Sequence, residues 1–161
     1  MHTAWWEDIE LVQHSPESIV VREDAPEKNG EPPRDLVERV SLFGERIVRF
    51  SKKIPRDPTN NRLIDQLVGA GTSTGANYCE ANEAVSQKDF KNTIGRCLKE
   101  AKETKFFLRM IVASEPSLAE EARTLYQEAH QLLRIFGAMQ VKIFGRATPV
   151  ELSYMQVEKI A

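Results

Sequence analysis

The stretch AGTSTGANYCEANEA at residues 70–84 decides how this chain folds, because small side chains fill a segment whose flanks repeat as a helix. Glycine costs up to about 1 kcal/mol of helix propensity relative to alanine, so glycines inside a helix point to a packing reason. Small side chains let two helix backbones approach closely. The stretch therefore predicts a helix that packs on two faces. One face would contact the chain's own core, and the other would contact a neighbouring subunit through Gly69, Ser73, Ala76, Asn77 and Glu80.

Apolar residues on both sides of this stretch repeat at alternating spacings of three and four, which is the period of a helix that buries one face. Residues 36–54, 90–111 and 118–143 follow this spacing. Pro55 would stop the first helix, since proline cannot continue one. We expect Thr59 or Asn60 to cap the second helix, which would continue to Val85, and Ser86 to cap the third.

These four helices with short connections predict an all-α fold, namely an antiparallel up-down-up-down four-helix bundle over residues 35–145. Residues 1–34 have no sustained period and contain four prolines, which predicts a flexible, acidic and largely irregular leader. Trp5 and Trp6 in this leader would pack on the bundle or, alternatively, dock a partner. Residues 146–161 would form a short C-terminal tail.

The composition is ordinary for a single domain of 161 residues, with 41% hydrophobic and 29% charged side chains. No apolar run approaches the roughly 20 residues that span a bilayer. The first residues also lack the basic and apolar regions of a secretory signal. We therefore expect no membrane interaction and a cytoplasmic location.

The net charge of −2 conceals an asymmetry along the chain. Residues 1–34 carry eight acidic and three basic side chains, whereas residues 35–161 carry 16 acidic and 19 basic ones. Basic side chains on the first and third predicted helices are candidates for contacts with nucleic-acid phosphates, and a solvated helix surface is the alternative interpretation. These candidates are Arg46, Arg49, Lys52, Lys53, Lys88, Lys91, Lys99, Lys102, Lys105 and Arg109.

No catalytic or metal-binding pattern stands out. A di-iron bundle needs Glu-x-x-His on two helices, and this chain has none. Cys79 and Cys97 lack CxxC spacing, and burial on helix faces would make both thiols inert. Glu100 and Glu103 could bind a hard cation together with Glu80, although such pairs more often form surface salt bridges. The sequence thus predicts a protein that is not an enzyme and holds no metal or cofactor.

Three segments together resemble a known family. They are GTSTGANYCEANEA at residues 71–84, KDF at residues 88–90 and LKEAKETKFFL at residues 98–108. In this order and spacing they resemble the bacterial four-helix-bundle proteins encoded by intervening sequences in 23S ribosomal RNA genes. The resemblance extends to the accessory variability protein of diversity-generating retroelements.

This resemblance implies a homo-oligomer of bundles with five-fold symmetry and a basic surface suited to nucleic acid. In the retroelement proteins that surface serves a reverse transcriptase and its RNA, so either is a possible partner here. Our first hypothesis is a non-enzymatic oligomeric scaffold that binds RNA or a ribonucleoprotein through basic stripes. The alternative is a protein–protein interaction module that binds no nucleic acid.

Overall fold

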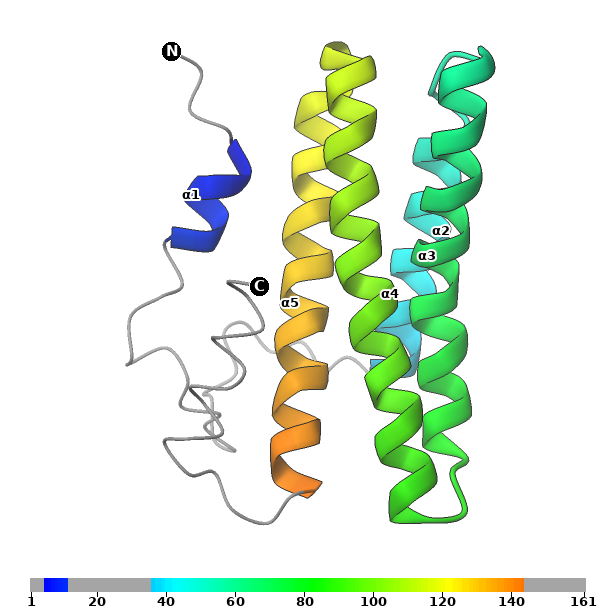
Figure 1. Cartoon of the computed structure of the whole chain (residues 1–161), viewed down its shortest axis with the longest axis vertical. Coiled ribbons are helices and arrows are strands. Elements are labelled where there is room, and N and C mark those ends of the chain that lie inside the picture. The colour runs from blue at the N-terminus through cyan, green and yellow to red at the C-terminus, as the bar shows by residue number, and fades with distance from the viewer. Residues whose placement is uncertain (1–4, 12–35, 144–161) are drawn as a thin grey trace.

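The computed structural model of this chain describes residues 5–11 and 36–143, and four long helices make up most of the described part (Figure 1). Successive long helices run in opposite directions, and short loops join them. The all-α, up-down-up-down bundle predicted from the apolar spacing is therefore confirmed. The helices are α2 (Leu36–Ser51), α3 (Pro58–Asn82), α4 (Gln87–Ser114) and α5 (Ala119–Ile143), with a 3-10 turn η2 (Pro116–Leu118) before α5.

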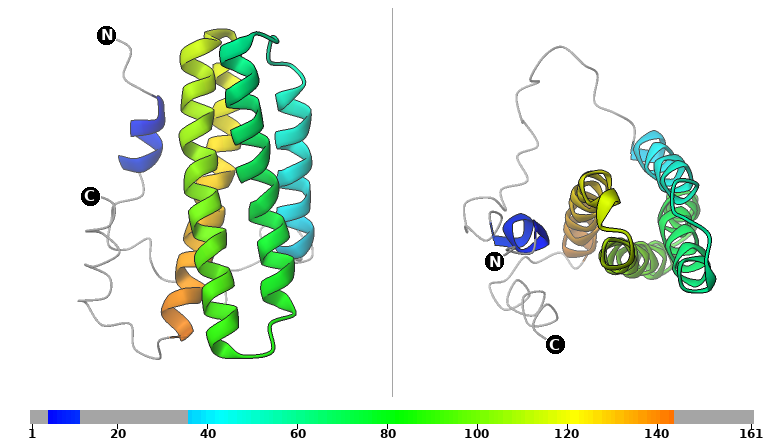
Figure 2. Two further views of the ribbon diagram at one scale, coloured as in Figure 1. Left: turned by 45° about the vertical axis from the view of Figure 1, so that its right-hand side comes forward. Right: turned by 90° about the horizontal axis from the view of Figure 1, so that it is seen from above.

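Each long helix packs against the next one along the chain, as the view down the bundle shows (Figure 2). The core between them consists of the predicted apolar stripes. Phe43 and Phe50 from α2 and Phe136 from α5 are fully buried. The ring of Tyr78 on α3 lies 5.7 Å from that of Phe136, so aromatic contact connects α3 with α5 across the bundle.

The ends of α3 differ from the prediction. Its N-cap is Asp57, not Thr59 or Asn60, and Pro58 occupies the first turn, where the missing N–H of proline costs nothing. At the other end α3 stops at Asn82, and Val85 is 96% exposed, so the expectation that the helix continues to Val85 is wrong. The chain turns there because Ser86 caps α4: its Oγ accepts a hydrogen bond from the backbone N–H of Asp89.

Asn60 forms a buried polar network that joins the α2–α3 loop to the end of α4. Its amide nitrogen lies 3.1 Å from the carbonyl oxygen of Pro55, 3.1 Å from a carboxylate oxygen of Asp57 and 2.8 Å from one of Glu115. The hydroxyl of Ser114 donates to the amide oxygen of Asn60 at 2.7 Å. Since Asn60 is completely buried, these bonds replace the water that its amide would otherwise bind.

A short helix, α1 (Trp5–Leu11), lies against α5 on the side away from α2 and α3 (Figure 2). The Trp5 ring makes an edge contact with Tyr126 at 5.1 Å, and Ile9 is buried. The interpretation that the tryptophan pair packs on the bundle is confirmed, whereas residues 5–11 of the predicted leader are helical and not irregular. Residues 12–35 and 144–161 lie outside the described residues, so the rest of the leader and the C-terminal tail stay predictions.

Candidate nucleic-acid and subunit interfaces

Two glycines of the small-residue stretch bring α3 against α2. A Cβ atom at Gly71 would lie 2.8 Å from Cγ2 of Ile47, and one at Gly75 would lie 3.2 Å from the carbonyl oxygen of Val40. A side chain at Gly71 would force Ile47 or the helix to move, and one at Gly75 would require the α2 backbone to shift by a few tenths of an ångström. Close helix approach was correctly predicted from the sequence, and at these two glycines the partner is α2 of the same chain.

A shallow open groove of about 550 Å³ runs along the outside of this helix crossing. Val40 and Gly75 line it together with small, polar and charged side chains. From α2 and the residue after it these are Ser41, Gly44, Glu45, Val48, Arg49 and Lys52, and from α3 they are Thr72, Ala76 and Cys79.

The five residues predicted to contact a neighbouring subunit differ in their surroundings, and their role in assembly stays a prediction. Ala76 lines the α2–α3 groove, whereas the Glu80 carboxylate pairs with Arg96 of α4 at 2.6 Å. Ser73 and Asn77 are half-buried. A Cβ at Gly69 would meet nothing within 4 Å, so no packing within the described residues explains this glycine.

Two residues of this outer surface were missed, namely Thr72 and Cys79. They stand four residues before and three residues after Ala76, so the same helical spacing that selected Ala76 would have found them. Cys79 is exposed, which corrects the expectation that both cysteines are buried. Cys97 is buried as expected, and this burial raises the pKa of its thiol from 9.0 to about 12.

Basic residues of α2 are largely engaged by nearby carboxylates. Arg49 pairs with Glu45 one turn earlier, and Nζ of Lys53 lies 2.8 Å from Glu121 of α5. Arg46 is half-buried, and Lys52 is exposed. Two of the four candidates on this helix are thus paired with carboxylates, and phosphate binding by these four residues stays a prediction.

On α4 the predicted basic stripe divides into two parts. Lys88, Lys99 and Lys102 are exposed, and Lys91 is half-buried. Lys105 and Arg109 are instead half-buried, with Lys105 beside α5 and Arg109 under Trp6 of α1, so these two candidates do not lie in the exposed part of the stripe.

Aromatic side chains hold these two cations in place. Nζ of Lys105 lies 3.1 Å from Nδ1 of His130 and 4.8 Å from the centre of the Tyr126 ring. The Arg109 guanidinium lies 4.3 Å from the centre of the Trp6 ring. Cation–π attraction is strongest with tryptophan and grows as water is excluded. The apolar side chains of α1 therefore cover part of the charge that the sequence assigned to the surface.

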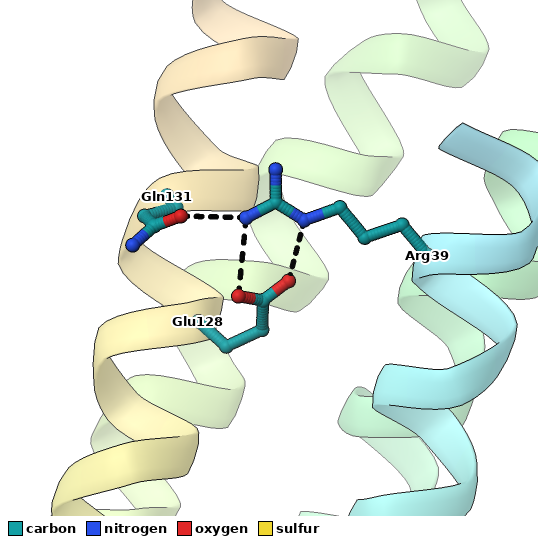
Figure 3. Close-up of polar contacts among 3 residues, drawn as sticks. All are labelled: Arg39, Glu128 and Gln131. Carbon is teal, nitrogen blue, oxygen red and sulfur yellow. Dashed lines mark hydrogen bonds and ion pairs between the residues drawn. The ribbon is translucent and has the colours of Figure 1, made fainter. Parts of the chain in front are cut away.

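A salt bridge with an added hydrogen bond connects α2 with α5 (Figure 3), and no sequence pattern predicts it. The guanidinium of Arg39 binds the Glu128 carboxylate through Nε at 2.6 Å and Nη2 at 3.1 Å. The same Nη2 donates to the side-chain oxygen of Gln131 at 2.6 Å. The fork of two parallel bonds fixes the geometry of this contact. It connects residues 89 positions apart, which spacing along one helix cannot reveal.

Within the described residues, no group of three or more His, Cys, Asp or Glu side chains could hold a metal ion. Glu100 and Glu103 face different surroundings: partial burial, and then the charge of Glu103, raise the pKa of Glu100. No helix in the described ranges is long and apolar enough to cross a bilayer. Catalysis and cofactor binding were not tested by these observations, so their predicted absence stays a prediction.

Comparison with known proteins places the bundle among its relatives. The sequence model of the family described as 23S rRNA-intervening sequence protein matches residues 35–138, which are the four long helices without the end of α5. A crystal structure of a protein of unknown function from the S23 ribosomal protein family of Bacteroides thetaiotaomicron is 25% identical, with a TM-score of 0.59. The alignment covers 66% of this chain and 98% of that protein. No curated protein matches.

Proposed function

Because the chain belongs to the family of 23S rRNA-intervening sequence proteins, we propose that it is a non-enzymatic helical scaffold that binds RNA through the exposed lysines of α4. The observation that carries this proposal is the placement of Lys88, Lys99 and Lys102. All three are exposed, and at 3.6 residues per turn they fall within about 60° of the helix circumference. A phosphate backbone could contact all of them at once.

The rest of the charged surface makes α4 the best-supported basic face. Arg49 and Lys53 on α2 already pair with carboxylates, which would have to be displaced before either could bind phosphate. Lys99 also has a carboxylate neighbour, but its Nζ lies 3.7 Å from Glu103 and both side chains are well exposed. That distance is too long for a hydrogen bond, so Lys99 is paired more loosely than Arg49 or Lys53.

Replacing Lys88, Lys99 and Lys102 together by glutamate is expected to abolish most of the RNA affinity. Each lysine that neutralises a phosphate releases counterions, so losing three contacts should reduce the salt slope of log Kd by about 2 for single-stranded RNA. Binding of labelled RNA, followed by fluorescence anisotropy from low to physiological salt, measures both quantities.

A matched variant separates this effect from net charge. Arg56, Arg62 and Arg123 are exposed on the α2–α3 loop, α3 and α5, and replacing these three by glutamate changes the net charge equally. This variant should bind RNA nearly as well as the wild type, apart from a general electrostatic loss shared by both variants. Equal losses in the two variants, or wild-type binding that does not respond to salt, would contradict the proposal.

We also propose that copies of the chain assemble through the outside of α3 and the α2–α3 groove. Gly69 and Ala76 are both exposed, a Cβ at Gly69 would meet nothing within 4 Å among the described residues, and the groove beside Ala76 offers a concave surface. Assembly of several bundles would multiply weak RNA contacts through avidity. The number of five copies and a partnership with a reverse transcriptase rest on the family resemblance alone.

Labelling of Cys79 should report this assembly. Cys79 lines the groove and is exposed in the single chain, so its thiol should react more slowly as protein concentration rises and neighbouring copies cover it. Cys97 serves as an internal control, since burial should keep it unreactive at every concentration. Mass measured by light scattering at the same concentrations gives the number of copies. A rise in mass with unchanged Cys79 reactivity would place the subunit contact elsewhere.

The alternative of a protein–protein interaction module has less support. It would use Trp5 and Trp6 to recruit a partner, but Trp5 contacts Tyr126 and Trp6 covers Arg109 in the same chain. A partner would first have to displace both contacts.

A further inference from the structure

Phe106 is a large aromatic side chain that α4 leaves in solvent. It is 53% exposed and lies about two turns before the end of α4, whose apolar face is buried in the core. The ring of the half-buried Phe107 meets it edge-on, with the two ring centres 5.2 Å apart. The two ring planes are nearly perpendicular, and about half of the Phe106 side chain remains open to solvent.

The lysines of the proposed RNA surface stand on the same side of the helix. Lys102 precedes Phe106 by four residues and Lys99 precedes it by seven, so helical geometry places them about 6 and 10 Å along the axis from it. The side chain of Lys99 is 72% exposed. An open aromatic ring therefore continues the line of positive charge along α4.

We propose that this surface of α4, made of Phe106, Lys99 and Lys102, binds unpaired RNA nucleotides, with a base stacked on the Phe106 ring and the lysines on the adjoining phosphates. The inference rests on the proposed RNA binding and deepens it by naming the form of RNA. Every base has a π-face, so stacking on an aromatic ring strengthens binding to a single strand without requiring a particular sequence. Bases inside a duplex are already stacked on one another and cannot reach the ring.

A subunit contact at Phe106 is the competing explanation for its exposure. The centres of subunit interfaces are depleted of charged residues, whereas Lys99, Lys102 and Glu103 all lie within two turns of Phe106. The proposed subunit surface also carries charge at Glu45, Arg49 and Lys52, but it adds the small exposed residues Gly69 and Ala76 of α3, which let another copy approach closely. The charge around Phe106 therefore favours a polyanion over a second copy of the chain.

The test compares a 12-nucleotide oligouridine with a blunt 12-base-pair RNA duplex, using full-length wild type and the Phe106→Ala, Phe106→Trp and Leu42→Ala variants. Leu42 is another exposed apolar residue, located on α2, and so controls for the general loss of apolar surface. The alanine variant at Phe106 should weaken single-strand binding about five-fold or more, and the tryptophan variant should retain it. Duplex binding and the salt slope should not change in either.

The outcomes separate this inference from the function on which it rests. A Phe106→Ala variant that loses no more single-strand affinity than Leu42→Ala overturns the inference, and salt-dependent RNA binding by the wild type would then still support the proposed function. Equal loss on single strand and duplex also overturns it. A fall in oligomer mass caused by Phe106→Ala would assign the residue to a subunit contact and overturn base stacking. Wild type that binds neither RNA overturns the proposed function itself.

Discussion

Replacing Asn60 by aspartate should lower the free energy of unfolding by about 3 kcal/mol or more at pH 7. The amide of Asn60 donates hydrogen bonds to the carboxylates of Asp57 and Glu115, and its side chain is completely buried. An ionised carboxylate at this position has no proton to donate and would face two like charges without water. Urea unfolding followed by circular dichroism measures the loss.

The pH dependence of this variant follows from the same geometry. Burial and the two neighbouring carboxylates would raise the pKa of the new carboxyl group in the folded state above its value in the unfolded chain. The folded state then binds the extra proton more readily, so the penalty is greatest above the folded-state pKa and shrinks as the pH falls toward that of an ordinary aspartic acid. The difference from wild type should therefore be smaller at pH 4 than at pH 7.

Asn61→Asp is the matched control for this substitution. Asn61 is the next residue in the same first turn of α3, but its side chain is exposed. A carboxylate in the first turn suits the helix dipole, so we expect a change within about 0.5 kcal/mol at either pH. A similar loss at both positions would show that the Asn60 network is not the cause.

Replacing Gly71 by leucine should destabilise the bundle by about 3 kcal/mol or more, because the first atom of the new side chain already overlaps Ile47. That atom would lie 2.8 Å from a methyl group of a side chain with no exposed surface. Ile47 is β-branched and packed in the core, so it cannot turn aside cheaply. Thermal and urea unfolding should both show the loss.

Gly69→Leu gives the opposite result two residues earlier in the same helix. Nothing lies within 4 Å of a Cβ at Gly69, and removing a glycine from a helix interior contributes up to about 1 kcal/mol. This variant should keep or slightly raise the stability of the single chain. Because we propose that Gly69 faces a neighbouring subunit, its oligomer mass should fall. Equal stability losses at both glycines would contradict the assignment of the two faces.

The sequence predicted the bundle because its information on helices is local. Within each helix, apolar residues recur at a spacing that places them on one side. Phe43 of α2, Ile94 of α4 and Leu132 of α5 belong to such repeats, and all three are buried in the core. The capping role of Ser86 was likewise visible in a few neighbouring residues. The ends of α3 could not be read from neighbouring residues in this way. Asp57 and Thr59 are both capping residue types, and the position of Pro58 decides between them.

The surroundings of the candidate site residues depend on contacts between segments that are distant in the sequence. The spacing of residues along one helix does not reveal such contacts. Helical periodicity correctly placed Lys88, Lys99 and Lys102 on the exterior, but it could not show that α5 contacts Lys105 or that α1 covers Arg109. It also could not pair Arg39 with Glu128, or Glu80 with Arg96. Such pairs form only when packing brings separate helices together.

By itself the sequence determined the helices, their buried faces and the close approach required at Gly71 and Gly75. Backbone hydrogen bonding and side-chain burial act within a few turns, so the order of residues is enough to specify them. The tertiary structure decided which small residues are used inside the chain and which face outward. It also decided which cations remain exposed. The roles of the small residues and the exposure of the cations depend on which helix surfaces pack together. The free energy of that packing comes from residues far apart in the sequence.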